Sequence, residues 1–363
     1  MPGPGTPAVA GATIGTLLFH ARRGARASRL SSPRITALTH PPLHATSAQL
    51  AGPTQHDAVL ARAPARLDFG GGWTDVPPYT TEQGGCVCNL AIARYASARL
   101  VADASGPTSD DALGAAAMRR SLVRDARLEI SSDFPFGAGL GGSSAAGVAL
   151  AAALATWKGE SVTRAELAER SRATEVEELG VAGGRQDHYA AAFGGALGLW
   201  FDDEVRAKPI TLPPAMIESL ERRCVVAFTG ESRISGETIT AVLDAYRARA
   251  PRVTSALARM KALAQQMILA LEREQIDELA ALVGEHWAHQ RTLHDRITTP
   301  TIDAVMREAT RAGALGGKAL GASGGGCVVV IAPDDGAEAV RRAVSSVCQV
   351  LDFTIDLEGV HVE

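Results

Sequence analysis

Residues 135–146 concentrate the groups that bind phosphate in proteins. They read Pro-Phe-Gly-Ala-Gly-Leu-Gly-Gly-Ser-Ser-Ala-Ala, and an alanine-rich run follows them up to Trp157. Glycines let the backbone approach a ligand, and the first turn of a helix offers free N–H groups and a positive dipole end. A glycine turn with a serine cap is the simpler alternative, but it needs one hydroxyl and at most two glycines. We therefore predict an anion site that consists of Gly137, Gly139, Leu140, Gly141, Gly142, Ser143 and Ser144.

Charged residues beside glycines elsewhere in the chain could complete this site. Phosphoryl transfer also needs oxygen ligands for a metal, a group that positions or deprotonates the nucleophile, and a cation. Asp187 lies between glycines and is the candidate base, and Glu177 is a candidate metal ligand. Arg66 and Lys318 are the candidate cations. The ordinary alternatives are a turn aspartate, a surface glutamate and solvated basic side chains.

The same glycines also satisfy the Gly-x-Gly-x-x-Gly pattern of dinucleotide-binding proteins, through Gly137, Gly139 and Gly142. Their surroundings argue against that function. Residues 132–135 separate the preceding strand from the glycines, and no acidic residue on a strand follows about 20 residues later to bind a ribose. A Walker loop is absent as well, because neither Ser nor Thr follows Lys318. The pattern therefore favours magnesium and a nucleoside triphosphate over a nicotinamide cofactor.

The bulk composition is that of a soluble enzyme. Apolar residues make up 46% and charged residues 21% of the 363 residues, and the net charge of −4 gives no reason to expect a nucleic-acid partner. The odd number of cysteines, 5, favours a reducing compartment. No apolar run reaches the roughly 18 residues that span a bilayer. We expect a cytoplasmic protein without a membrane partner and leave open whether it forms a homodimer.

Composition divides the chain into three parts. Residues 1–56 contain no acidic residue and are rich in Pro, Gly, Ala, Ser and Arg, which predicts a disordered extension, with a targeting segment as the alternative. The length of the remainder predicts two domains, and the prolines near residues 202–214 place their boundary. We therefore expect one domain over residues 57–213 and a second over residues 214–363.

Periodicity predicts both helices and strands, and hence a mixed α/β (α+β) class. Residues 86–92 and 95–102 are predicted to form two strands, and residues 142–157 a helix. Thr163 followed by Glu166 is a capping box, which predicts the start of another helix.

Three segments resemble the motifs of the GHMP kinases, named for galacto-, homoserine, mevalonate and phosphomevalonate kinases. Residues 135–146 match the second motif, Pro-x-x-x-Gly-Leu-Gly-x-Ser-Ser-Ala, and residues 63–75 and 320–326 match the first and third. The resemblance covers nearly all of the chain after residue 57. It implies an N-terminal α/β domain with a left-handed βαβ unit and a ferredoxin-like C-terminal domain, with ATP and the substrate in the cleft between them.

The resemblance also implies roles for individual residues. Ser144 and Glu177 would bind magnesium, Asp187 would act as the base or orient the acceptor hydroxyl, and Arg66 would assist it. Asp75 would hold substrate hydroxyls. The remaining residues implied as substrate contacts, the last three of them for a second phosphate, are Gly72, Gly324, Gly325, Arg185, Arg233 and Lys318.

Within the family, residues 184–195, 229–233 and 313–318 are similar to the kinases that phosphorylate the anomeric hydroxyl of heptose 7-phosphate. Trp73 and residues 76–79 are more like those of fucokinases. The resemblance thus implies an ATP- and magnesium-dependent sugar 1-kinase, with D-glycero-D-manno-heptose 7-phosphate as the first acceptor and L-fucose as the second. A non-catalytic sugar or nucleotide sensor of the same fold is the alternative, although such a protein needs neither a base nor a metal ligand.

Overall fold

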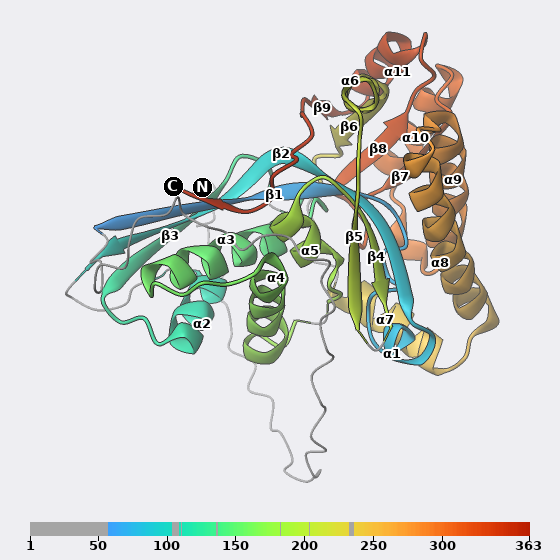
Figure 1. Cartoon of the computed structure of the whole chain (residues 1–363). Helices are drawn as coiled ribbons and strands as arrows, with labels where there is room; N and C mark the ends of the chain where they lie inside the picture. Colours follow the sequence, from blue (N-terminus) through green and yellow to red (C-terminus); the bar gives the residue numbers. More distant parts are fainter. Residues whose placement is uncertain are drawn as a thin grey trace, which may run out of the picture. The chain divides into compact units, whose positions relative to one another are not determined.

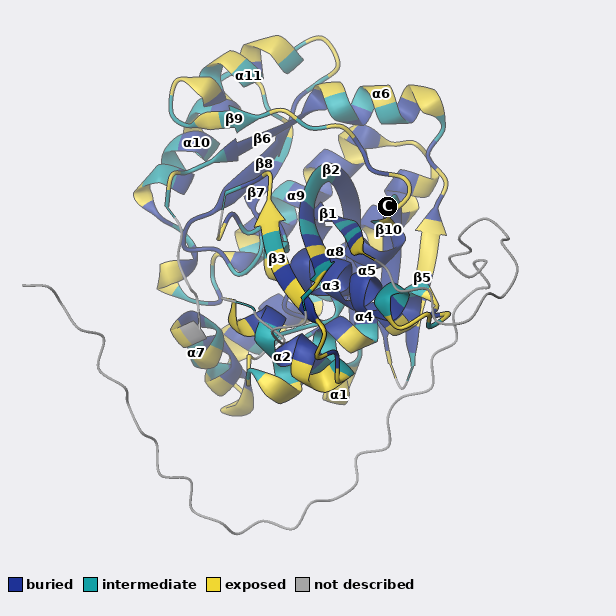
Figure 2. Ribbon diagram, turned by 90° about the vertical axis from the view of Figure 1, so that its left-hand side faces the viewer, coloured by how far each residue is buried: buried dark blue, intermediate teal, exposed yellow. Residues whose placement is uncertain are grey.

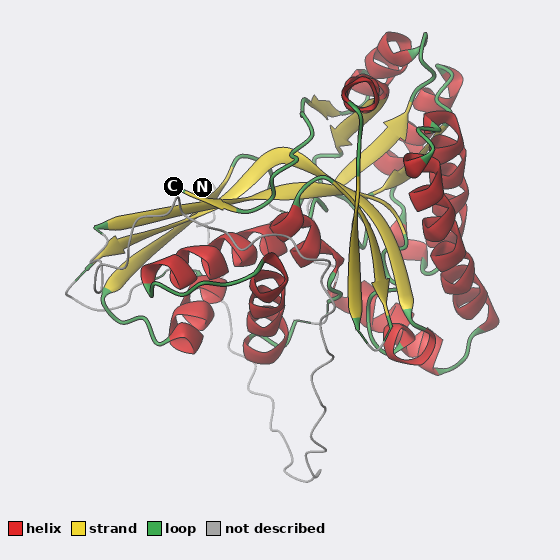
Figure 3. Cartoon of the chain, viewed as in Figure 1, coloured by secondary structure: helices red, strands yellow, loops and turns green. Residues whose placement is uncertain are grey.

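The computed structural model describes residues 57–103, 109, 111–135, 137–181, 183–202, 204–231 and 236–363. The predicted extension over residues 1–56 lies outside this part of the chain, and so does Arg233. The described residues form helices and two antiparallel sheets, which confirms the predicted mixed α/β class (Figures 1 and 3).

The larger sheet has the strand order β10-β1-β2-β4-β5, and β3 pairs with β2. Its strands are β1 (Ala58–Gly70), β2 (Gly85–Ala102), β3 (Ala126–Ser132), β4 (Ala196–Phe201), β5 (Val205–Ile210) and β10 (His361–Val362). Residues 202–214, the expected boundary between the domains, thus include a strand of this sheet. The end of the chain returns to the same sheet, because β10 pairs with β1.

The prediction of two strands over residues 86–92 and 95–102 is wrong, because β2 is one strand of 18 residues. Pro64 faces Tyr95 and the next residue, Ala65, faces Ile92, so the ladder shifts by two residues of β2 at this point. The extra residues form a bulge, and the pairing with β1 continues on both sides of it. In the sequence analysis the residues of this bulge, 93 and 94, were interpreted as a break between two strands.

Helices cover both faces of the inner strands. The helices on one face are α2 (Ala112–Ser121), α3 (Gly142–Trp157), α4 (Arg164–Ala173) and α5 (Gln186–Phe193), with α3 and α5 directly on β1 and β2. On the other face α8 (Pro251–Glu272) contacts β1, β2, β4 and β5 (Figure 1). From Ala63 onward β1 is therefore buried on both sides (Figure 2). The predicted helix over residues 142–157 is confirmed as α3.

The smaller sheet has the order β7-β8-β6-β9. Its strands are β6 (Cys224–Phe228), β7 (Gly316–Ala319), β8 (Cys327–Ile331) and β9 (Gln349–Leu351). The helices α6 (Pro214–Arg223), α9 (Ile276–Gln290), α10 (Pro300–Arg311) and α11 (Ala337–Ser345) contact its strands. The five cysteines are free thiols. None of the helices in the described ranges is long and apolar enough to cross a membrane.

The predicted capping box at the start of α4 is confirmed. The Thr163 hydroxyl accepts a hydrogen bond from the Glu166 backbone N–H at 3.2 Å, and the Glu166 carboxylate accepts one from the Thr163 N–H at 2.7 Å. At its other end α4 continues into a π-helical turn, Thr174–Glu178. Such single turns occur often at functional sites, because they change the direction in which the following side chains point.

Candidate active site

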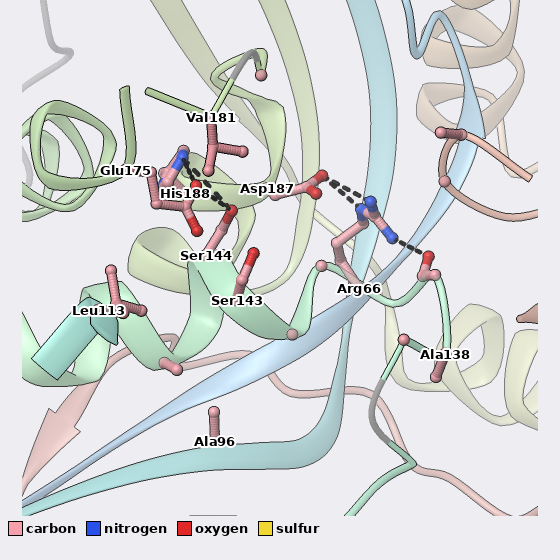
Figure 4. A pocket seen from close by; sticks show the side chains of 18 of the residues that line it. Arg66, Ala96, Leu113, Ala138, Ser143, Ser144, Glu175, Val181, Asp187 and His188 are labelled. Atoms are coloured by element: carbon pink, nitrogen blue, oxygen red, sulfur yellow. Dashed lines mark hydrogen bonds and ion pairs between the residues drawn. The ribbon is translucent and has the colours of Figure 1, made fainter. Parts of the chain in front are cut away.

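A cavity of about 1210 Å³ brings together parts of the three glycine-rich segments. Its walls come from β1 and the loop after it, from the glycine loop before α3, from the start of α5, and from the loop after β7. Figure 4 shows Arg66 of β1 pointing toward Asp187 of α5, and Ser144 of the glycine loop pointing toward Glu175 and His188. The three segments lie far apart in sequence, so the tertiary fold is what makes them one site.

The glycine loop approaches its neighbours so closely that side chains would not fit. Gly139 has a φ of +71°, and a Cβ there would lie 2.8 Å from the Leu320 carbonyl oxygen. A Cβ on Gly141 would lie 3.3 Å from the Cβ of Asp187. No side chain caps the start of α3, so its first N–H groups are available to a ligand. Most of the predicted loop residues line the cavity, namely Gly137, Gly139, Gly141, Gly142, Ser143 and Ser144.

Leu140 is the exception in this loop. Its side chain is buried in the hydrophobic core, and its carbonyl oxygen accepts a hydrogen bond from the Arg66 backbone N–H at 3.0 Å. It does not line the cavity. Leu140 therefore fastens the glycine loop to β1 and presents no side chain to a ligand.

Arg66 and Asp187 meet at the centre of the site. The Asp187 Oδ1 lies 2.8 Å from the Arg66 Nε and 2.7 Å from its Nη2. The Arg66 Nη1 also donates to the Gly139 carbonyl oxygen at 2.7 Å (Figure 4). The Arg66 side chain is 3% exposed and that of Asp187 26% exposed. The arginine thus holds the carboxylate and the glycine loop in one arrangement, with the carboxylate open to the cavity.

Ser144 lies beside a buried carboxylate. Its Oγ is 3.4 Å from the Glu175 Oε2 and 3.4 Å from the His188 Nε2, and this nitrogen is 3.2 Å from the same glutamate oxygen. Burial alone would raise the pKa of Glu175, but the contact with His188 and hydrogen bonds from Ser143 and Ser144 outweigh it and lower that pKa. Glu175 is therefore an anion at neutral pH.

The structure corrects the prediction for Glu177. This residue does not line the cavity, and its side chain is 59% exposed and pairs with Arg120 at 2.9 Å. Two residues apart on a helix point in nearly opposite directions, so a buried Glu175 places Glu177 outside. Sequence reasoning named Glu177 and missed Glu175; in the structure Leu167, Ser171 and Glu175, spaced four residues apart, are all buried.

Asp75 lines the cavity and also forms hydrogen bonds with the backbone at the start of α5. Its Oδ2 accepts hydrogen bonds from the backbone N–H groups of Arg185 at 2.9 Å and Gln186 at 3.0 Å. It thereby caps the start of α5, immediately before Asp187. Burial, and next the nearby charge of Asp187, raise the pKa of Asp75 to about 6, although the Gln186 N–H opposes the shift. Gly72 lines the cavity beside it.

Lys318 is not available to a substrate phosphate, contrary to the prediction. Its side chain is 0% exposed, and its Nζ donates to the backbone oxygen of Asp68 at 2.8 Å and to the Oδ2 at 2.9 Å. Its side chain reaches from β7 to Asp68 on β1, and Lys318 does not line the cavity. Asp68 itself lines the cavity. Sequence reasoning missed it, although a residue two positions after Arg66 on a strand shares its face.

Arg185 and the third glycine segment also differ from the prediction. The Arg185 Nε lies 3.3 Å from a Glu169 oxygen, and the residue does not line the cavity. The Gly324 N–H donates to the Ile297 carbonyl oxygen at 2.9 Å, so this amide is not free for a ligand. Gly324 and its neighbour Gly325 shape the loop, and the residues of this loop that line the cavity are Gly321 and Ala322.

Comparison with known proteins matches both halves of the chain to one family. The description "GHMP kinases N terminal domain" matches residues 110–195, and "GHMP kinases C terminal" matches residues 267–350. The first match includes the glycine loop, Glu175 and Asp187, and the second includes β7 and β8.

Individual relatives extend this similarity over most of the chain. The chain is 26% identical over 336 residues to the D-glycero-alpha-D-manno-heptose 7-phosphate kinase of Campylobacter jejuni, covering 83% of this chain and 98% of the relative. It is 26% identical to the L-fucokinase/L-fucose-1-P guanylyltransferase of Bacteroides fragilis, covering 76% of this chain and 35% of the relative. The crystal structure of a D-glycero-D-manno-heptose 1-phosphate kinase from Bacteroides thetaiotaomicron matches with a TM-score of 0.69 and 26% identity, covering 84% and 98%.

Asp75→Asn tests the cost of the buried charge that caps α5. Folding raises the pKa of Asp75 from 3.8 to about 6, so the folded protein holds this proton more tightly than the unfolded chain does. The stability that this proton contributes is present at low pH and is lost as the pH rises through about 6. The unfolding free energy of the variant, relative to that of the parent protein, should therefore rise by on the order of 2 kcal/mol as the pH is raised from about 4 to 7.5.

Urea denaturation at both pH values measures this change. Asp202→Asn is the matched control, because the Asp202 side chain is 57% exposed, and its unfolding free energy should follow that of the parent protein. An equal response of the two variants to pH would contradict the assignment of the raised pKa to Asp75.

Proposed function

Since the chain belongs to the GHMP kinase family, we propose that it transfers the γ-phosphoryl group of ATP to the anomeric hydroxyl of a sugar. The first candidate acceptor is D-glycero-D-manno-heptose 7-phosphate, which would give the 1,7-bisphosphate. The observation that carries the proposal is the Arg66–Asp187 pair, which lies against the glycine loop and opens to the cavity.

In this mechanism the chain positions two substrates and a proton. The glycine loop and the start of α3 bind the triphosphate through backbone N–H groups. Both contacts with Arg66 fall on the Asp187 Oδ1, which leaves Oδ2 to orient the acceptor hydroxyl and take its proton as the new O–P bond forms. Arg66 keeps the carboxylate in place and adds positive charge near the transferred group.

The residues present also suit magnesium. The ion prefers oxygen ligands, and Ser144 and the ionised Glu175 offer a hydroxyl and a carboxylate side by side at the start of α3. When bound, magnesium would neutralise charge that develops on the phosphates. His188 holds the Glu175 carboxylate toward Ser144. Glu175 thus takes the role that the sequence assigned to Glu177.

Two observations bear on the acceptor. The Campylobacter and Bacteroides heptose kinases are each covered over 98% of their length, whereas the fucokinase relative is covered over 35%. Trp73, where the chain resembles fucokinases, lines the cavity, and this favours L-fucose as the second candidate. A non-catalytic sensor would not need the paired Arg66 and Asp187, so an enzyme remains the proposal.

The proposal is tested by an ADP-release assay with ATP, magnesium and four separate sugars: D-glycero-D-manno-heptose 7-phosphate, L-fucose, D-mannose and D-galactose. We expect turnover with the heptose phosphate, and a product that is phosphorylated at the anomeric oxygen. Turnover with fucose alone would select the second acceptor. Sugar binding without ADP release from any of the four would support the sensor instead.

Asp187→Asn tests the catalytic carboxylate. The amide keeps the shape of the side chain but is a poor proton acceptor, so we expect kcat to fall by about 100-fold or more while ATP still binds. Asp202→Asn, at an exposed aspartate, is the matched control and should keep the parent kcat. A kcat within a few-fold of the parent value would remove Asp187 from this role.

Glu175→Gln and Glu177→Gln form a matched pair that locates the metal ligand. They remove one negative charge each, from a buried and from an exposed side chain of the same turn. We expect the first to raise the magnesium concentration for half-maximal activity by about 10-fold, since a carboxylate ligand is lost, and the second to leave it unchanged. The opposite ranking would restore Glu177 as the ligand.

A further inference from the structure

Ser171 in α4 contacts His188 but lies outside the cavity. Ser171 is 1% exposed and does not line the cavity, whereas His188 does. The Ser171 Oγ is 2.9 Å from the His188 Nδ1, and the other ring nitrogen, Nε2, faces Glu175 and Ser144. A Cβ at Gly147 in α3 would clash with the Ser171 Oγ, so this glycine makes room for the hydroxyl. Helices α3, α4 and α5 therefore meet at one buried serine hydroxyl.

The neighbours of the His188 ring assign its hydrogen atom. The Nε2 lies 3.2 Å from the Glu175 Oε2, and an ionised carboxylate only accepts hydrogen bonds, so the Nε2 must carry a hydrogen. A ring with a single N–H then accepts at the Nδ1, and the Ser171 hydroxyl is the donor. The other acceptor near this hydroxyl, the Ser144 carbonyl oxygen, is farther away at 3.4 Å. The contacts thus run from Ser171 through His188 to Glu175.

His188 follows Asp187 directly in the first turn of α5. Adjacent residues on a helix point about 100° apart, because a turn has 3.6 residues. Asp187 faces Arg66, while His188 faces Glu175 and Ser144 (Figure 4). One helical turn therefore holds the candidate base on one side and supports the candidate metal ligand on the other.

We propose that Ser171 is a positioning residue for the metal site: its hydroxyl holds His188 in the tautomer whose Nε2 donates to Glu175, and the ring thereby directs that carboxylate to the metal. This inference rests on the proposed kinase function. Ser171 touches neither the substrates nor the metal. Groups that hydrogen-bond to a metal ligand typically contribute about 10- to 100-fold to metal affinity or activity.

Loss of the Ser171 hydroxyl has a specific consequence. Without a donor at its Nδ1, the His188 ring also adopts the tautomer that carries the hydrogen there. The Nε2 lone pair then faces the Glu175 carboxylate, and the two repel each other. Arg66 still holds Asp187, because this contact does not involve Ser171. The metal ligand is therefore affected and the catalytic carboxylate is not, whereas a general loosening of α5 would affect both.

Nitrogen-15 NMR of the histidine rings tests the tautomer without ATP, metal or sugar. The full chain with labelled histidine is measured at about pH 8, where free imidazole is neutral, and the signals lost in His188→Gln identify this ring. We expect the hydrogen on the Nε2 in the parent protein and a mixture of both tautomers in Ser171→Ala. A parent ring with its hydrogen on the Nδ1, or the same tautomer in parent and variant, would overturn the inference.

Calorimetric titration with adenylyl imidodiphosphate, a non-hydrolysable ATP analogue, measures the consequence at the metal site. The ratio of its affinity with magnesium to its affinity with EDTA reports the contribution of the metal. We expect Ser171→Ala to lower this ratio by about 10-fold, with the affinity in EDTA and the kcat at saturating magnesium within about twofold of the parent values. Ser121→Ala is the control, because the Ser121 hydroxyl donates to the Met118 carbonyl oxygen of its own helix.

His188→Leu completes a double-mutant cycle with Ser171→Ala. We expect His188→Leu to lower the ratio by about 10- to 100-fold and Ser171→Ala to change it little further in that background, since Ser171 acts through the ring. Fully additive effects of the two changes would contradict this route. If His188→Leu does not fold, His188→Gln replaces it in the cycle, because an amide has no tautomer for Ser171 to select.

Failure of the inference is distinguishable from failure of the proposed function. Absence of turnover with any of the four sugars contradicts the proposed kinase, and an unchanged magnesium requirement in Glu175→Gln contradicts its metal site. A magnesium requirement that rises in Glu175→Gln, together with a parent-like affinity ratio in Ser171→Ala, contradicts only the role of Ser171.

Discussion

The buried guanidinium of Arg66 is the interaction on which the site depends. It contacts Asp187, which lies 121 residues away in the chain, and the carbonyl oxygen of Gly139, which lies 73 residues away. Removing an arginine from water is costly unless its N–H groups find charged or polar partners. Here two N–H groups donate to the Asp187 Oδ1 and a third donates to the Gly139 carbonyl oxygen. A shift of the glycine loop would remove its carbonyl partner, and a shift of α5 would remove its carboxylate partner.

Residues from the second half of the chain form hydrogen bonds with β1, the loop after it and the glycine loop. Lys318 reaches Asp68 in β1, the His286 Nε2 accepts from the Gly71 N–H at 2.9 Å, and the Cys327 N–H donates to the Ala138 carbonyl at 2.7 Å. Burial, and next the charge of Lys318, lower the pKa of His286 far below its usual range, so its ring stays neutral and accepts this hydrogen bond. Hydrogen bonds from both halves of the chain thus hold the cavity walls together.

The carboxylates that line the cavity differ in pKa because their neighbouring groups differ. Asp68 has a buried lysine and Glu175 has a histidine and two hydroxyls, so burial does not prevent either from being ionised. Asp75 has only backbone N–H groups and faces the negative charges of Asp187 and Asp68, and its pKa is raised to about 6. Acidic groups whose pKa values differ in this way can serve as a hydrogen-bond acceptor, a metal ligand and a helix cap within one site.

Features that depend on local backbone chemistry could be predicted from the amino-acid sequence. The phosphate-type glycine loop, the helix that follows it and the capping box at Thr163 are set by residues close together in the chain. The resemblance to the family motifs also predicted the fold class, because these motifs mark the loops that lie next to a ligand.

Which side chains contact one another depends on the three-dimensional packing and could not be predicted from the sequence. It directed Lys318 away from a ligand to Asp68, paired Arg185 with Glu169, and made Asp75 a cap for the helix of Asp187. It also joined two predicted strands through a bulge. Burial, pairing and pKa depend on neighbours from distant segments, and a charged residue type does not specify its partner. The residue types determined what chemistry was available, and packing determined which residues perform it.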